Sequence, residues 1–490
     1  MPKITLEDAF IVIRDLGAIF HLLALVMPVP ALATIYFERN LPINTIIWDT
    51  FTMLVPAIIF YLLYLFCSEL KIQHSAQTSH AMVAVATAWL IVALVCATPF
   101  ILRGQLNPID AFFESMSGWA TNGFTIIPDI EGFPKDLLLF RSWMQFVGGV
   151  GFIGLALITI EGNLPALEYY LSGVGGQKIT PSVHGTVRVM WRIFLLYALA
   201  GIVMLYIAGM PIFDAVCISF SAISTGGFTP HAANIAYYGS HAIEAVLILM
   251  MTMGAISFFV HYQLFQGRWK ELFRNLEFKY YIILVSCGWL LITLFLIEWD
   301  TATPQTITTT AWEALFHVVS ASTTTGFRIS DISRWSEPAK SVLMFLMYVG
   351  GAYGSSAGGI RLLRFAVVTA ALLYTLRRLM YPKSAVIALK AGGRVFTEDE
   401  AFFALTLCCA YVIIAFLGAV GLSLAGFASG DSLSISLASL GEVGLQQVPT
   451  SDWLAMSDWA KMLITLLMWV GRIEIFPLLA IARIVIRRRI

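Results

Sequence analysis

The stretch SASTTTGFR at residues 320–328 decides the fold, because similar stretches occur three more times in the chain. They are SGWATNGFT at 117–125, SAISTGGFT at 221–229 and, more weakly, ASLGEVGLQ at 438–446. Their shared glycine recurs about every hundred residues. That interval accommodates one helix, one loop and one further helix, so the chain is predicted to contain four such units.

The composition places the chain in a lipid bilayer. Of its 490 residues, 59% are apolar and 12% charged, and the mean hydropathy is +0.81. A soluble globular protein has about 25% charged residues. The formal net charge is zero, which gives no indication of a nucleic-acid partner.

Apolar stretches long enough to span a bilayer predict about ten transmembrane helices. They cover residues 16–37, 46–68, 82–102, 138–160, 192–209, 242–265, 280–298, 341–375, 402–427 and 460–482. Four shorter apolar stretches, at 109–120, 212–224, 311–322 and 430–441, are expected to be re-entrant pore helices.

The predicted fold is therefore an all-α integral membrane protein with four helix–pore-loop–helix repeats around a central pore and an N-terminal two-helix hairpin. The boundaries are expected at 1–75 for the hairpin and at 76–185, 186–270, 271–395 and 396–490 for the repeats. Basic clusters follow every second long span, at 268–279, 377–394 and 483–489. The positive-inside rule makes these loops and the N-terminus cytoplasmic, with the short helices on the outer side.

An acidic residue stands thirteen positions before each repeated glycine. These candidate pore-helix acids are Asp110, Asp214, Glu313 and Asp431. In the first turn of a short helix, a carboxylate complements the positive end of the helix dipole. The sequence therefore predicts that the opposite, partly negative ends converge towards the membrane centre.

The repeated stretches have the chemistry of a cation selectivity filter. Glycine adopts positive φ angles at low cost, and backbone carbonyl oxygens in a ring can replace the hydration shell of a cation such as potassium. The candidate filter residues are Thr121, Asn122, Gly123, Thr225, Gly226, Gly227, Thr324, Thr325, Gly326, Glu442, Val443 and Gly444. The expected ligand is K⁺ held by these carbonyls, without an organic cofactor.

With these motifs, the chain resembles the TrkH/KtrB superfamily of potassium transporters over essentially its whole length, and its N-terminal helix pair resembles the TrkH branch. The resemblance implies channel-like potassium uptake, with possible Rb⁺ and Na⁺ transport. Two departures are Asn122, where threonine is more usual, and Glu442, where asparagine is commoner. Gly123 at the first filter position is similar to the potassium-selective members.

The resemblance also implies a gate. A stretch rich in small residues, GGAYGSSAGG at 350–359, matches the family's intramembrane gating loop. Its candidate gate residues are Gly350, Gly351, Gly354, Ser355, Ser356, Ala357, Gly358 and Gly359. The resemblance implies that Arg472 projects into the pore, although it could instead pair with Glu474 or another acid in packing.

By the same resemblance, the protein is expected to be a multi-pass protein of the cell (inner) membrane, surrounded by lipid, and to form a homodimer. It is also expected to bind a cytosolic TrkA-like ring that senses nucleotides. Whether transport is passive or coupled to another ion, as in a symporter, is left open by the sequence.

Other classes fit the sequence less well. Residues 354–358 match G-x-S-x-G and residues 149–154 match G-x-G-x-x-G, but both lie in apolar spans without the strand that either motif requires. No enzymatic activity is expected. An alternating-access carrier of an organic solute would lack four pore loops. A Na⁺-selective member of the same superfamily remains a second alternative.

Overall fold

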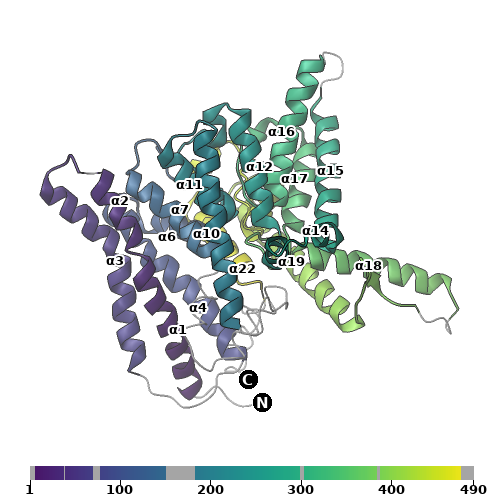
Figure 1. The fold of residues 1–490 in the computed structure, drawn as a ribbon, viewed down its shortest axis with the longest axis horizontal. Coiled ribbons are helices and arrows are strands. Elements are labelled where there is room, and N and C mark those ends of the chain that lie inside the picture. Colours follow the sequence, from purple (N-terminus) through teal and green to yellow (C-terminus); the bar gives the residue numbers. More distant parts are fainter. Residues whose placement is uncertain are drawn as a thin grey trace.

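The computed structural model describes residues 6–37, 39–69, 78–150, 183–297, 303–382 and 387–475. These residues are predominantly helical, and the strands among them are two short ones, β1 (Lys390–Ala391) and β2 (Arg394–Val395), which pair antiparallel. Figure 1 shows the helices gathered into one membrane-type bundle, from which α18 (Leu362–Met380) projects to one side.

The N-terminal hairpin consists of α1 (Leu6–Val26), α2 (Val29–Phe37) and α3 (Ile43–Ser68). Its two arms pack along their length, and the rings of Phe20 and Phe60 stack at 5.9 Å. A polar junction joins the hairpin to the first repeat. There, Arg103 forms ion pairs with Asp49 and Asp136, and Thr34 donates to Asp136 at 2.9 Å. This partly buried network fixes the hairpin against the bundle.

Each repeat has a first helix, a short pore helix and a second helix. The first helices are α4 (Thr78–Cys96) with α5 (Thr98–Leu102), α10 (Val183–Ile207), α15 (Leu276–Leu296) and α19 (Glu398–Leu424). The pore helices are α6 (Pro108–Trp119), α11 (Ile212–Ile223), α16 (Pro304–Ser322) and α20 (Ser429–Leu440). The second helices are α7 (Lys135–Gly149), α12 (His241–Ala255), α17 (Glu337–Val349) and α22 (Asp458–Arg472).

Smaller helices complete the described chain. They are α13 (Phe258–Phe265), α14 (Trp269–Arg274), α21 (Thr450–Leu454) and two 3₁₀ turns, η1 (Asn234–Tyr238) and η2 (Ile332–Arg334). Thr397 begins α19 with a capping box: its hydroxyl accepts from the Glu400 amide, and the Glu400 carboxylate accepts from the Thr397 amide. The four-repeat fold with an N-terminal hairpin is thus the one expected from the sequence.

The helices α12 and α17 are shorter than the spans predicted for them. Among the described residues, six helices are long and apolar enough to cross a bilayer, or seven if α12 and α13, bent by 106°, count as one. The second helix of each repeat instead ends after 13 to 15 residues. Hydropathy averages over a break, so it predicts one span for α12 with α13 and one for α17 with α18. Residues 151–160 and 476–482, the ends of two expected spans, lie outside the described residues.

Glycines near the ends of three second helices allow these helices to approach their own pore helix closely. A Cβ added at Gly148, Gly254 or Gly471 would overlap the last carbonyl oxygen of α6, α11 or α20, respectively. Small residues permit such close backbone approach within bilayers. Gly148 therefore permits close helix packing, whereas residues 151–154 lie outside the described part of the chain.

Candidate functional site

The four repeated loops share one unusual backbone conformation. The residue two positions before each repeated glycine has a positive φ, at Thr121 (55°), Thr225 (53°), Thr324 (56°) and Glu442 (59°). The glycines follow in the same region, with φ between 61° and 93°. Positive φ is costly for a β-branched residue such as threonine. Four copies of one strained pattern indicate that the loops have a common role, and they establish that the fourth, weaker stretch is a true repeat.

The four loops form a closed ring. A Cβ built on Gly123 would overlap the carbonyl oxygen of Gly226 in the second loop, and a Cβ on Gly227 would overlap that of Thr325 in the third. The same relation joins Gly326 to Val443 in the fourth loop, and Gly444 back to Asn122 in the first. Each glycine therefore touches the carbonyl that precedes the next glycine. The C-terminal ends of the four pore helices, which are partly negative, adjoin this ring.

A loop from the third repeat lies against one end of the ring. It runs between α17 and α18 and begins and ends at two glycines with positive φ, Gly350 (70°) and Gly359 (77°). The Gly358 amide donates to the Thr324 hydroxyl at 2.8 Å. The Ser356 hydroxyl donates to the carbonyl oxygens of Ile223, at 3.0 Å, and Gly254, at 2.9 Å. The loop thus contacts the second and third repeats directly.

Arg472, the last residue of α22, lies at the same end of the ring as this loop. Its Nη1 is 2.8 Å from Oε2 of Glu442 and 3.3 Å from the Thr121 hydroxyl, and its Nη2 donates to the Gly148 carbonyl at 2.5 Å. The Arg472 and Glu442 side chains are 8% and 3% exposed, so this is a buried ion pair. Glu474 pairs instead with Arg361 and Arg364. Arg472 therefore pairs with Glu442 and not with Glu474, although Glu474 is nearer to it in the sequence.

Known proteins share this architecture. The sequence model of the TrkH family, described as "Cation transport protein", matches residues 49–488. The chain belongs to the TrkH family. An uncharacterized cation transporter of Methanocaldococcus jannaschii is 30% identical over 487 residues, covering 98% of this chain and 96% of that protein. The Escherichia coli Trk system potassium uptake protein TrkH is 31% identical over 405 residues, covering 80% and 83% of the two chains.

A solved structure of the same family has a similar fold. The crystal structure of the potassium transporter TrkH from Vibrio parahaemolyticus superposes with a TM-score of 0.81 at 27% identity, covering 95% of this chain and 97% of that chain. The resemblance to the TrkH/KtrB superfamily that the repeated motifs suggested is confirmed, as is the TrkH branch that the N-terminal helix pair suggested, and the TrkH family is a family of cation transport proteins.

Side chains behind the ring hold the loops of this TrkH-family chain in place, and they differ between repeats. The hydroxyls of Ser117 and Ser320 each donate to the carbonyl of the residue after the filter glycine. The fourth loop has an alanine at this position, Ala438, and Asn122 of the first loop donates to its carbonyl oxygen at 2.9 Å. In the second loop, Gln145 of α7 donates to the Gly226 carbonyl at 2.6 Å. The Asn122 side chain therefore joins the first loop to the fourth pore helix by a hydrogen bond.

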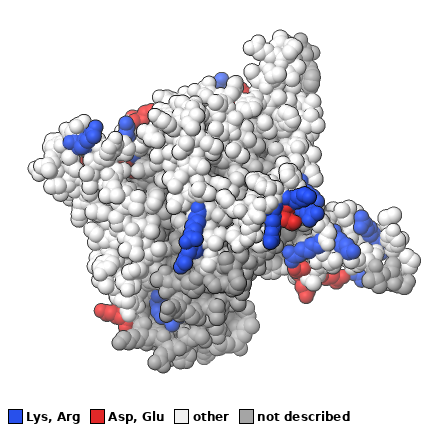
Figure 2. Space-filling view, viewed as in Figure 1, with Lys and Arg blue, Asp and Glu red and all other residues white. Residues whose placement is uncertain are grey.

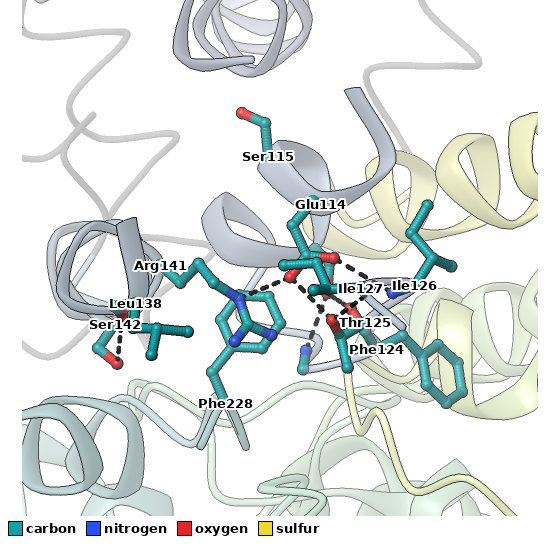
Figure 3. Close-up of polar contacts among 12 residues, drawn as sticks. Glu114, Ser115, Phe124, Thr125, Ile126, Ile127, Leu138, Arg141, Ser142 and Phe228 are labelled. Atoms are coloured by element: carbon teal, nitrogen blue, oxygen red, sulfur yellow. Dashed lines mark hydrogen bonds and ion pairs between the residues drawn. The ribbon is translucent and has the colours of Figure 1, made fainter. Parts of the chain in front are cut away.

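A buried ion pair supports the outer ends of the first two loops (Figure 3). Glu114 of α6 and Arg141 of α7 point towards each other, with Nε 2.6 Å from Oε1, and their side chains are 0% and 1% exposed. The Glu114 carboxylate also accepts from the Thr125 hydroxyl at 3.0 Å and the Ile126 amide at 3.3 Å. On its other side, the Arg141 guanidinium lies 4.0 Å from the centre of the Phe228 ring, in the second loop. The pair links the loops that follow two filter glycines.

We expect the Glu114→Gln substitution to destabilise the protein strongly, because it leaves the Arg141 charge buried without its counter-ion. Breaking a buried pair in this way costs about 3–5 kcal/mol. Thermal unfolding of the purified protein in detergent would show a lower midpoint. The control is Glu271→Gln, which removes the exposed pair with Arg274 and should leave the midpoint unchanged. An unchanged midpoint for Glu114→Gln would contradict the structural role of the pair.

The predicted pore-helix acids do not all lie where the sequence suggested. Asp110, Asp214 and Asp431 are in the first turn of α6, α11 and α20. Glu313 is not, because α16 begins at Pro304, capped by Thr303, and thus extends several residues beyond the other pore helices. The prediction that Glu313 lies at the positive end of its pore helix is therefore wrong. Asp110 is also engaged elsewhere, since Lys461 of α22 lies 2.6 Å from its carboxylate.

The sequence did not predict three residues that support the repeated loops, namely Glu114, Arg141 and Gln145. Arg141 and Gln145 lie within an apolar span, and Glu114 within a short apolar segment. An ionisable residue at membrane depth is rare and is usually paired or functional. That signal was available for Glu114 and Arg141, whereas an isolated glutamine carries no comparable signal.

Proposed function

We propose that this protein takes up potassium across the cell membrane through the ring formed by the four loops. The closed contact between each filter glycine and the next carbonyl is the observation that carries the proposal. It brings one glycine and one carbonyl group from each of the four repeats around one axis. Carbonyl oxygens there can replace the water around a dehydrated cation. The relatives named as potassium uptake proteins support K⁺ as the cargo. The filter residues proposed are those assigned from the sequence.

In this proposal, residues 350–359 form the gate. Their contacts with Ile223, Gly254 and Thr324 hold the loop across the inner end of the ring. A non-helical backbone at membrane depth is tolerated where it lines a cavity or is covered by protein. Opening requires these hydrogen bonds to break, so the gate is an equilibrium between bound and released loop.

Arg472 is proposed to control permeation together with Glu442, as a pair. Glu442→Gln should leave the positive charge of Arg472 without its counter-ion next to the ring, so we expect cation uptake to fall roughly tenfold. Arg472→Gln should have the opposite sign and raise uptake, and the double variant should lie between the two. Initial rates of rubidium uptake by cells measure all three. Equal rates for both single variants would contradict the electrostatic role.

The homodimer and the TrkA-like ring stay proposals, and the name Trk system of the relatives supports a further component. Lys and Arg side chains gather near α14 and the base of α18 (Figure 2). Helix α14 and its N-cap contain Arg268, Lys270 and Arg274. We propose that this face is cytoplasmic, as the positive-inside rule indicates, and that it receives the regulatory ring. Lys383 and the arginines at 483–489 lie outside the described residues. The N-terminus is then cytoplasmic, and the protein is a multi-pass protein of the inner membrane.

Uptake of ⁸⁶Rb⁺ by cells that lack their own potassium uptake systems tests the proposed function. We expect uptake above the vector control, inhibited more strongly by potassium than by sodium. Stronger inhibition by sodium would favour the Na⁺-selective alternative. Inhibition by an organic solute, without inhibition by either cation, would favour a solute carrier and overturn the proposal.

A further inference from the structure

A second ring of side chains lies just outside the filter. It consists of the residues two positions after the four filter glycines: Thr125, Thr229, Arg328 and Gln446. All four border a single cavity of about 30 Å³, which the filter residues Gly123, Gly227 and Gly444 also line. A cavity of this size has room for about two water molecules, or for a cation that has lost part of its hydration. This ring therefore borders the space through which a cation reaches the filter from outside.

Arg328 gives this ring a positive charge that forms no direct ion pair, although the Asp331 carboxylate attracts it from a longer distance. Its backbone is fixed, since its amide donates to the Asn234 side chain at 3.0 Å and its carbonyl accepts from the Ile235 amide at 3.1 Å. Its side chain is half-buried, and within the described part of the chain its guanidinium forms no hydrogen bond or ion pair.

The acids nearest to the cavity each have another cation or donor. Asp331, three residues further on, pairs with Arg334 at 3.2 Å. Glu114 pairs with the second arginine that borders the cavity, Arg141. The Asp214 carboxylate is likewise engaged, since it accepts from the Tyr238 hydroxyl at 2.9 Å and lies 3.1 Å from the ring of His231. Among these charges, the positive charge of Arg328 is the one without a direct counter-ion.

We propose that Arg328 is a specificity-determining residue, whose fixed charge at the outer mouth of the filter limits the entry of cations and disfavours divalent cations above all. This inference rests on the proposed function. Electrostatic repulsion scales with the charge of the entering ion. If the charge weakens the binding of a monovalent cation in the cavity by some factor, it weakens that of a divalent cation by the square of that factor. The arginine thus protects a carbonyl ring from block by divalent cations, which bind oxygen ligands strongly.

The test compares charge-changing variants in cells that lack other potassium uptake, where the outer side is defined. Two constants are measured: the external ⁸⁶Rb⁺ concentration that gives half-maximal uptake, and the external Ba²⁺ concentration that halves uptake. In Arg328→Gln, which copies the residue of the fourth repeat, we expect the rubidium constant to fall roughly threefold and the barium constant about tenfold. Arg328→Lys keeps the charge and should resemble the wild type. Arg39→Gln removes an exposed arginine far from this ring in the sequence, and both of its constants should also equal those of the wild type.

Unchanged constants in Arg328→Gln, with normal wild-type uptake, would overturn this inference alone. A change of the rubidium and barium constants by the same factor would also overturn it. Such a result would indicate that the substitution changes the shape of the cavity and does not act through charge. If Arg328→Gln does not reach the membrane, Gln446→Arg decides, since a second positive charge on the ring should raise both constants, barium more. Absence of rubidium uptake by the wild type would overturn the proposed function itself.

Discussion

Replacing Gly227 by alanine should abolish cation uptake while leaving the protein folded in the membrane. The added Cβ would overlap the carbonyl oxygen of Thr325, and φ at this position is 80°, which alanine adopts only at a cost. The ring must open by a few tenths of an ångström or more, and a displacement of about 1 Å at a positioned site can cost roughly 100-fold in rate. We expect initial rubidium uptake to fall by at least that factor.

Gly430→Ala is the matched control for this prediction. Gly430 lies in the first turn of α20, has nothing within 4 Å of an added Cβ, and keeps an ordinary φ. The same chemical change there should leave uptake near the wild-type rate. Normal uptake by a well-expressed Gly227→Ala protein would mean that the four loops do not form the permeation path.

Replacing Ser356 by alanine should raise cation uptake. Its hydroxyl is shared between the carbonyl oxygens of Ile223 and Gly254, and it is a side-chain contact of the loop with the second repeat, beside three backbone hydrogen bonds. Loss of such a hydrogen bond, with two carbonyls left without it, costs the closed state about 1–2 kcal/mol. That shifts an equilibrium between closed and open loop by roughly five- to thirtyfold. The initial rate of rubidium uptake, corrected for the amount of protein in the membrane, measures the shift.

The neighbouring Ser355→Ala variant separates gating from a general loosening of the loop. The Ser355 hydroxyl donates to the Ala352 carbonyl at 2.6 Å and accepts from the Ala357 amide, so its contacts stay within the loop. We expect a smaller change in uptake for this variant. An equal rise in both variants would indicate that the loop is merely less ordered, and a fall in Ser356→Ala would contradict the proposed gate.

The sequence predicted the parts of the fold that depend on periodicity. The four loops, the four pore helices and the N-terminal hairpin follow from hydropathy and from a glycine that recurs in register. The left-handed conformation at Thr121, Thr225, Thr324 and Glu442 could not be predicted, because propensity argues against positive φ at threonine. The surrounding structure imposes it, as is usual for strained positions at functional sites.

The breaks in the second helices and the partner of Arg472 also depend on tertiary contacts. Because hydropathy averages the residues on both sides of a break, it predicts one span at 341–375, whereas α17 and α18 are separate helices. Arg472 is two residues from Glu474 in the sequence but pairs with Glu442, thirty residues away. The start of α16 at Pro304 escaped prediction for a similar reason, since polar threonines continue this helix beyond its apolar part.

Uptake of ⁸⁶Rb⁺ into liposomes that contain only the purified protein tests the central claim most directly, because it removes every other transporter. We predict rubidium accumulation that external potassium inhibits and that is absent with Gly227→Ala but present with Gly430→Ala. Equal accumulation with the wild type and with Gly227→Ala would contradict conduction through the ring of four loops.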